Sequence, residues 1–126
     1  MTLREMCKSK IHRATVTGAD LHYIGSVGLD RNLMSLTNII PGEKVSIWNC
    51  NNGARIETYA IPLESDSGQV VVNGAAARHF HPGDHVIIVA FCLTDKPVSA
   101  KMIVVDDKNG FVQHLPGNHE PESIEP

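Results

Sequence analysis

Short segments rich in Val, Ile and Thr recur along the chain, and turn-forming dipeptides separate them. These residues favour strands, whereas Asn-Gly and Pro-Gly favour tight turns because Gly and Asn adopt positive φ at low cost. The strand-like segments are residues 11–17, 45–48, 55–61, 69–72, 85–93 and 102–105. The dipeptides are Asn52-Gly53, Asn73-Gly74, Pro82-Gly83 and Asn109-Gly110. The pattern predicts a mainly β domain of six or more short strands arranged as a meander.

One segment has the periodicity of a helix instead. Four apolar residues recur at the spacing of one helix face: Leu29, Leu33, Leu36 and Ile40. Asp30 is the expected N-cap. Pro41-Gly42 is expected to end the helix, because proline lacks the N–H donor and glycine can take the left-handed conformation.

The length of 126 residues suffices for one hydrophobic core and is too short for a second domain with a large cofactor cleft. Hydrophobic residues make up 42% and charged residues 20%, close to the average of globular proteins. After Leu115 the chain is rich in proline and glutamate and has one large apolar residue, Ile124. We therefore expect a single domain at residues 1–115 and a flexible tail at residues 116–126.

Charge and hydropathy exclude two classes of partner. The net charge is −3 and no basic stripe is present, so the electrostatic footprint of a nucleic-acid-binding protein is missing. The longest apolar run, residues 86–93, is far shorter than the roughly 20 residues of a membrane span, and we expect no signal peptide. Three widely spaced cysteines without a C-x-x-C pair are typical of a reducing compartment. We expect a cytoplasmic protein.

Histidines gather around Pro82-Gly83. His79 and His81 would face the same side of a strand and could share a metal ion with His85, as in small cupin-type barrels. Such barrels also need a carboxylate on the same inner face, whereas Asp84 and His85 follow a turn that redirects the chain. Two interpretations stay open, a small metal-binding β-barrel or a loop with exposed histidines.

A second candidate site is one face of the strand at residues 55–61. Arg55, Glu57 and Tyr59 alternate with Thr58, which points to the other face. Arg55 can bind a carboxylate through two parallel hydrogen bonds, and Tyr59 can donate a proton. Lys10 adds a cation immediately before the first predicted strand. Taken alone, these faces are typical of solvated or interface surfaces.

Three segments, in the same order and spacing, resemble one enzyme family. They are KSKIHRATVTGADLHYIGSVGLD, NNGARIETYAI and NGAAARHFHPGDHVIIVAF, and they closely resemble the pyruvoyl-dependent aspartate 1-decarboxylases. The match covers residues 6–91, about two thirds of the 126 residues, and continues weakly over residues 103–109. Gly28 stands where the family leads us to expect Thr or Ala. The resemblance implies a double-psi β-barrel with one or two short helices.

The resemblance also implies an inactive precursor that cuts itself between Gly25 and Ser26 into residues 1–25, the beta chain, and residues 26–126, the alpha chain. The Ser26 hydroxyl would attack the Gly25 carbonyl, and elimination and hydrolysis would leave a pyruvoyl group at position 26. Because no coded side chain carries a ketone, this step supplies one without a diffusible cofactor. We therefore expect neither a metal ion nor pyridoxal phosphate. Glycine at position 25 suits the tight backbone geometry that the attack is expected to need.

In the family, the pyruvoyl group at position 26 forms a Schiff base with L-aspartate, and loss of carbon dioxide gives β-alanine for pantothenate and coenzyme A synthesis. Motif position makes Tyr59 the proton donor. The implied substrate contacts are Thr58, Gly74, Ala75, Ala76, Arg55 and Lys10. The family builds its sites between the subunits of a homotetramer. The sequence leaves open which carboxylate Arg55 and Lys10 each hold, and whether a helper protein assists maturation.

Overall fold

A computed structural model describes residues 1–118, and within them the chain forms nine strands, one α-helix and one 3₁₀ helix. The strands are β1 (Arg4–Thr15), β2 (Gly18–Asp20), β3 (Ser26–Asp30), β4 (Lys44–Asn49), β5 (Arg55–Leu63), β6 (Val70–Asn73), β7 (His85–Thr94), β8 (Lys101–Val105) and β9 (Phe111–Leu115). The helices are α1 (Arg31–Thr37) and η1 (Gly74–His79). The strands pair in the order β2-β6-β3-β5-β4-β7-β1-β8-β9.

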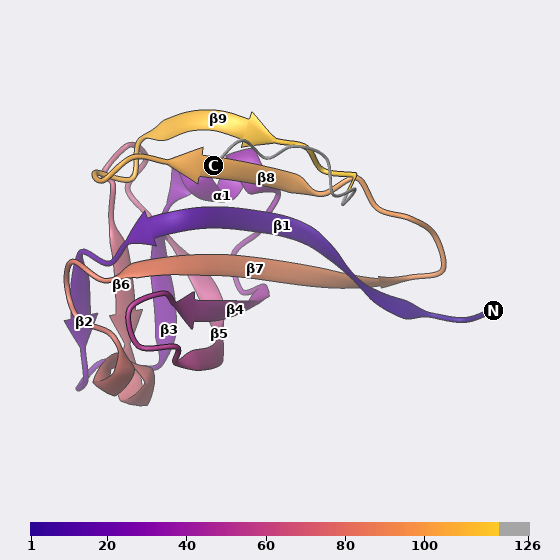
Figure 1. The fold of residues 1–126 in the computed structure, drawn as a ribbon. Coiled ribbons are helices and arrows are strands. Elements are labelled where there is room, and N and C mark those ends of the chain that lie inside the picture. The colour runs from indigo at the N-terminus through magenta and orange to yellow at the C-terminus, as the bar shows by residue number, and fades with distance from the viewer. Residues whose placement is uncertain (119–126) are drawn as a thin grey trace.

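The strands form two groups that cross at a steep angle (Figure 1). One group contains β1, β4, β7, β8 and β9, and the other contains β2, β3 and β6. β5 belongs to both, because its first half pairs with β4 and its second half pairs with β3. Core side chains come from both groups: Ile11, Val27, Leu29, Ile47, Val72, Ile88 and Ile103 are fully buried. The fold is mainly β and consistent with a small double-psi barrel. The described sheet is not closed, because its two edge strands, β2 and β9, do not pair with each other.

Local sequence signals correctly located the strands that they predicted. Each of the six predicted segments overlaps an observed strand. The hairpin predicted at Asn52-Gly53 joins β4 to β5, with Gly53 at a φ of 76°. The turn predicted at Asn109-Gly110 joins β8 to β9, with Asn109 itself at a φ of 63°. Positive φ thus occurs at the Asn or Gly positions that adopt it at low cost.

The predicted meander is wrong. Among the strands of residues 1–118, only β4 with β5 and β8 with β9 are consecutive antiparallel neighbours. β1 instead runs parallel to β8, β2 parallel to β6, and β3 parallel to β5. Turn dipeptides report local hairpins, whereas parallel pairs need long crossovers that leave no such local signal.

The predicted helix begins at its expected cap but is shorter than predicted. The Asp30 side chain caps α1 as expected. Leu29 belongs to β3, and the helix ends before Asn38, which adopts the left-handed conformation with a φ of 57°. Ile40 is 62% exposed and lies beyond the helix. Gly42 has a positive φ of 85°, but it shapes the turn into β4.

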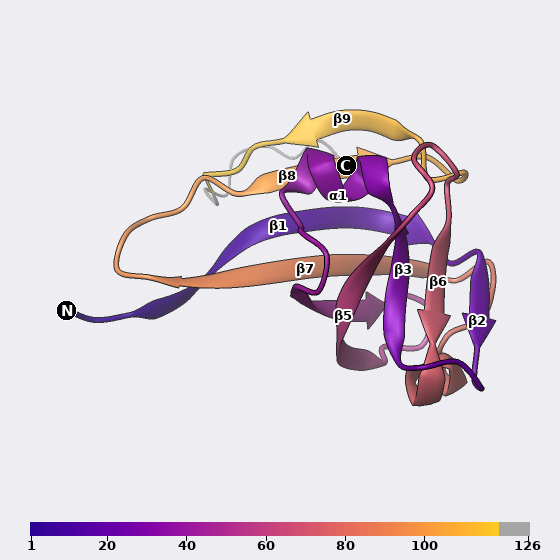
Figure 2. The ribbon, with the colours of Figure 1, turned by 180° about the vertical axis from the view of Figure 1, so that it is seen from behind.

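Two features lie at the edge of the barrel. The start of β1, the end of β7 and the loop after β7 project from it as an arm, seen from both sides in Figures 1 and 2. Of the expected tail, the Gly117 carbonyl accepts a hydrogen bond from the Ala100 N–H (2.8 Å), and residues 119–126 lie outside the described part.

None of the described helices is long and apolar enough to cross a membrane.

Candidate active site

Ser26 is the first residue of β3, and its side chain is only 2% exposed. The preceding residue, Gly25, is exposed. Both neighbouring strands fix this end of β3, because Ser26 pairs with Asn73 of β6 and Val27 pairs with Ala60 of β5. The peptide bond between Gly25 and Ser26 therefore lies where an exposed loop enters the sheet, next to an immobilised hydroxyl.

Asn73 is a site residue that the sequence analysis missed. Its side-chain amide donates a hydrogen bond to Ser26 Oγ (3.1 Å), and Asn73 itself is 6% exposed. A donor held on that oxygen fixes the position of the hydroxyl and stabilises the alkoxide that forms when the hydroxyl loses its proton. Its position directly before the Gly-Ala-Ala motif could have revealed it, but Asn before Gly also predicts a turn, and that reading hid its role.

Gly74 lies against the backbone of Gly25. It has a φ of 75°, and a Cβ added there would stand 2.7 Å from the Gly25 Cα. Only glycine permits both the conformation and this approach. A Cβ added at Gly25 would meet nothing within 4 Å, and Gly25 has no positive φ. The tight geometry expected at Gly25 is thus observed at Gly74.

Gly74, Ala75 and Ala76 open helix η1 immediately after Asn73. Because Asn73 pairs with Ser26, these three expected substrate contacts begin next to the serine. Ala75 is exposed, and Ala76 packs partly against the core. The structure therefore brings residues 73–76 together with Gly25 and Ser26.

Tyr59 stands where β5 changes partner strands. It is the last residue paired with β4, and Ala60 is the first paired with β3. Counting back one residue from the Val27–Ala60 pair sets Tyr59 level with Ser26. Tyr59 is 41% exposed, and Thr58 on the other face of β5 is half-buried. The two side chains alternate as predicted, and both belong to the junction beside the serine.

The two predicted carboxylate-binding cations lie elsewhere on the sheet. Arg55 begins β5, four residues before Tyr59 and so about 13 Å from it along an extended strand. Lys10 lies on β1, which β4 and β7 separate from β5. A single chain therefore does not gather Arg55, Lys10 and Ser26 at one point.

The histidines do not form a metal site in the described part of the chain. His79 ends η1, His81 lies in the following turn and His85 begins β7. No group of three His, Cys, Asp or Glu side chains in residues 1–118 could hold a metal ion. Asp84 instead accepts hydrogen bonds from the Asn49 amide (2.9 Å) and the His81 N–H (3.0 Å), and the bond from Asn49 lowers the pKa of Asp84. The geometry favours the loop interpretation.

Gly28, where the resemblance led us to expect Thr or Ala, makes room for Leu63. A Cβ at position 28 would stand 2.7 Å from Leu63 Cδ1. Gly28 is buried within β3 and paired on both sides, with Val71 and Ile61. The Leu63 side chain thus fills the space that a larger residue at position 28 would need.

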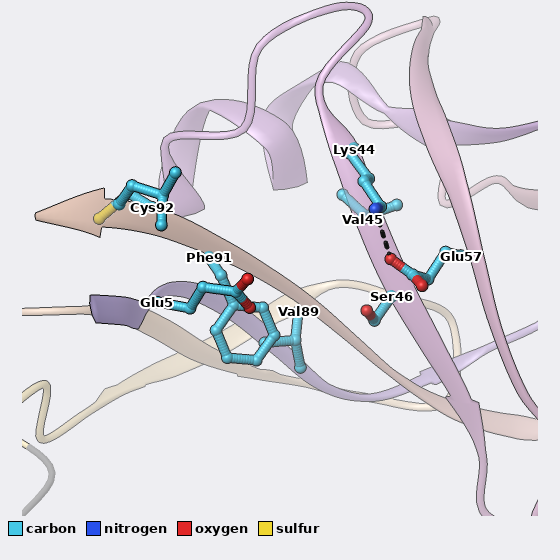
Figure 3. Close-up of a pocket in the computed structure, with 9 residues that line it drawn as sticks. Glu5, Lys44, Val45, Ser46, Glu57, Val89, Phe91 and Cys92 are labelled. Carbon is cyan, nitrogen blue, oxygen red and sulfur yellow. Dashed lines mark ion pairs between the residues drawn. The ribbon is translucent and has the colours of Figure 1, made fainter. Parts of the chain in front are cut away.

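Two adjoining grooves lie on the outer face of the sheet. One of about 200 Å³ is lined by Glu5, Lys44, Val45, Ser46, Glu57, Val89, Phe91, Cys92 and Leu93 (Figure 3). The other, of about 250 Å³, is lined by Ser46, Trp48, Arg55, Ile56 and Glu57. Neither groove is lined by Ser26. Of the predicted site residues, Arg55 therefore lines one of these two grooves, the one of about 250 Å³.

Comparison with known proteins gives first a class and then a family. Several relatives are each named aspartate 1-decarboxylase, which gives the class of the chain as a carboxy-lyase. The family model described as aspartate decarboxylase matches residues 1–112, a longer stretch than the three sequence motifs span. The chain belongs to the aspartate decarboxylase family.

Three relatives, each named aspartate 1-decarboxylase, illustrate the similarity. That of Moorella thermoacetica is 50% identical over 110 residues, covering 84% of this chain and 86% of the relative. That of Thermoanaerobacter pseudethanolicus is 51% identical over 110 residues, covering 84% and 94%. That of Bacillus cereus (strain G9842) is 50% identical over 116 residues, covering 89% and 91%. The similarity extends over nearly the full length of both partners.

Proposed function

We propose that this chain is a self-processing, pyruvoyl-dependent decarboxylase that converts L-aspartate to β-alanine and carbon dioxide. The observation that carries the proposal is the hydrogen bond from Asn73 to the Ser26 hydroxyl, next to the exposed Gly25. The relatives named aspartate 1-decarboxylase support the choice of substrate. β-Alanine serves pantothenate and coenzyme A synthesis, so we assign the enzyme to that pathway in the cytoplasm.

Self-cleavage would start at Ser26 Oγ. This oxygen bonds to the Gly25 carbonyl carbon, the carbon–nitrogen bond between the two residues breaks, and the hydroxyl proton passes to the freed amine. Loss of the Ser26 Cα proton then expels the Gly25 carboxylate, and water displaces the nitrogen as ammonia. The products are residues 1–25 with an ordinary carboxylate and residues 26–126 beginning with a ketone. Asn73 would hold the attacking oxygen in position through its hydrogen bond.

The ketone at position 26 supplies the electron sink for decarboxylation, which is the reason for making it. The remaining tasks belong to the chain's own residues. Tyr59 would donate the proton that replaces the lost carboxylate. Thr58 and residues 74–76 would orient the substrate, since they lie at the two strands that flank Ser26.

Arg55 and Lys10 would bind the substrate carboxylates across subunits of a homotetramer. Lys10 pairs with Val89, Val89 with Ser46 and Ser46 with Glu57. Directly paired residues share a face, so Lys10 lies on the same outer face as Glu57 and therefore as Arg55. Side chains that share an outer face but not a strand can converge when two barrels pack together. This arrangement supports a site between subunits.

Intact mass measurement of the purified, incubated protein tests the cleavage. We expect residues 1–25 and residues 26–126 as two chains, the larger one blocked to Edman degradation. Ser26→Ala should fold but remain a single inactive chain, whereas Ser35→Ala, on an exposed position of α1, should be cut like the parent. A full-length chain that decarboxylates aspartate would contradict the mechanism. Cleavage that starts only after a cell extract is added would reveal a helper protein.

The proposal requires no metal ion and no pyridoxal phosphate. Exhaustive chelation should leave the activity unchanged, whereas borohydride with aspartate present should inactivate the enzyme by fixing the substrate amine to position 26. Complete loss on chelation, restored by one divalent metal, would instead support a role for His79, His81 and His85.

A further inference from the structure

The guanidinium group of Arg55 is held in place without being neutralised. Its Cζ lies 4.6 Å from the centre of the Trp48 ring, and Trp48 is directly opposite on β4. This cation–π contact uses none of the guanidinium N–H donors, and no hydrogen bond to a described residue occupies them. Within residues 1–118, Arg55 takes part in no ion pair. Such an arginine is ready to bind a carboxylate with two parallel hydrogen bonds.

Glu57 is the carboxylate best placed to neutralise Arg55, because it lies two residues further on the same face of β5. It is already engaged, however. Glu57 Oε2 pairs with Lys44 Nζ at 2.7 Å, across from β5 to β4, as the dashed line in Figure 3 marks. The hydrogen bond with Glu57 also raises the pKa of Lys44, which keeps the amine charged.

The direction of this pairing matters for Arg55. Along β4, Trp48 lies opposite Arg55, and Lys44 lies opposite Tyr59. Glu57 stands between the two positions, so its pairing with Lys44 turns the carboxylate away from Arg55. The groove of about 250 Å³ between Arg55 and Glu57 is left for another occupant.

We propose that Lys44 is a positioning residue for substrate binding, which holds Glu57 so that Arg55, resting on Trp48, stays open to a substrate carboxylate. Without Lys44, the Glu57 carboxylate would bind Arg55 as an internal competitor of the same chemistry as the substrate group. The inference rests on the proposed function, in which Arg55 binds a carboxylate of the substrate.

The test uses two ligands of the mature protein, aspartate and succinate. Succinate has the two carboxylates but no amine, so its binding does not depend on the ketone. Lys44→Met should weaken succinate binding and raise the KM for aspartate by about 2–5-fold, with kcat unchanged, because an exposed ion pair competes to that extent. Lys44→Met combined with Glu57→Gln should restore both values, since a neutral amide does not compete. Lys44→Arg keeps the cation and should behave like the parent.

A matched control and a reference variant complete the design. Lys101→Met makes the same change at an exposed position of β8 and should alter neither value. Arg55→Gln should weaken succinate binding on its own, and adding Lys44→Met to it should have no further effect, because the site of competition is gone.

The outcomes separate the inference from the proposed function. Unchanged succinate binding in Lys44→Met, with weakened binding in Arg55→Gln, would overturn the role of Lys44 and leave Arg55 as the anchor. Failure of Arg55→Gln to weaken binding would overturn the inference by removing its target. If the succinate affinities of the parent and the variants follow the expected order, but the parent releases no carbon dioxide from aspartate, only the proposed function would be contradicted.

Discussion

Tyr59 occupies the junction at which β5 leaves β4 for β3, which suits a proton donor beside position 26. Replacing it with Phe keeps the ring and removes one hydroxyl, so folding and cleavage at Ser26 should survive. We expect kcat to fall by about 10²–10⁴-fold, the usual contribution of a general acid. Single-turnover kinetics on fully cleaved Tyr59→Phe protein would measure this loss of rate. Turnover at the parent rate would mean that another group, or water, delivers the proton.

His12, on β1, has a ring nitrogen, Nδ1, that is buried without a hydrogen-bond partner in the described structure. Burial, followed by the charges of Lys10 and Arg13, lowers its pKa from the ordinary value of 6.5. The unfolded chain therefore takes up this proton near pH 6.5 and the folded chain only at lower pH. Consequently the free energy of unfolding decreases as the pH falls below 6.5.

His12→Gln removes this titration and should flatten the pH dependence of stability. Both proteins should carry Ser26→Ala, so that neither is cut during the measurement. Denaturant unfolding at about pH 7.5 and about pH 5.5 should show a smaller loss of stability in the His12→Gln protein. Equal losses would mean that the His12 pKa is the same in the folded and unfolded chains.

Single residues differ in how far the sequence reveals them. Gly25, Ser26 and Tyr59 were predicted as site residues because they lie inside motifs that resemble a known family. Asn73 was missed because an Asn-Gly dipeptide also predicts a turn. The pairing of Lys44 with Glu57 depends on the register of a hairpin, which fixes cross-strand neighbours only once the fold is known.

The connection from β3 to α1 depends on one carboxylate, that of Asp30, which is 3% exposed. It accepts hydrogen bonds from the N–H groups of Asn32 (2.8 Å), Asp66 (2.9 Å) and Gly68 (2.9 Å). Asp30→Ala would leave all three donors without this partner and should lower the free energy of unfolding by about 2–4 kcal/mol. Asp30→Asn keeps one acceptor oxygen, so its free energy of unfolding should lie between those of Asp30→Ala and the parent.

Denaturant unfolding of the uncut proteins measures this effect. Asp95→Ala, at an exposed position in the loop after β7, is the control and should change the free energy by less than about 0.5 kcal/mol. If Asp30→Ala lowers the free energy of unfolding no more than this control does, solvent replaces the lost acceptor.

Among the elements, the strands with strong local signals were predicted, and three others, β2, β3 and β9, were not. β3 was missed because it is buried on both faces and contains Gly28 and Asp30, so it shows no alternation. Leu29 fits the helical period by coincidence, so the predicted apolar face of the helix included a residue that belongs to β3. β2 has three residues, too few for any periodicity to appear.

The strand order of the whole molecule could not be read from local patterns. Three parallel pairs, β1 with β8, β2 with β6 and β3 with β5, join segments far apart in the sequence. Only the resemblance to a family predicted a barrel of this kind. The local reading gave a meander, because turn residues specify which strands form hairpins and say nothing of crossovers.

The position of β1 determines how the cut molecule is held together. β1 lies inside the sheet between β7 and β8, and it contributes the fully buried Ile11 and Ala14 to the core. The proposed cleavage separates this strand, within residues 1–25, from every strand with which it pairs. The two chains of the mature enzyme would then stay together without a covalent bond, through backbone and side-chain hydrogen bonds, the Lys8–Glu43 ion pair and core packing.

Refolding from denaturant should expose this difference. In the uncut Ser26→Ala chain, β1 stays covalently joined to the strands with which it pairs. Recovery of its β-sheet circular dichroism signal, which reports the folding of the single chain, should therefore not depend on protein concentration. The cut protein must first bring two molecules together, and its recovery should fall on dilution. Equal recovery of both proteins at low concentration would contradict this prediction.

Maturation would therefore change the order of the folding reaction from first to second. Before cleavage, the polypeptide can lose and regain its structure without an encounter with another fragment. Afterwards, any release of residues 1–25 is a dissociation, and at low concentration a fragment that has left the sheet does not return. If the chain gains its ketone by cutting itself, it would thereby lose the ability to refold as a single molecule.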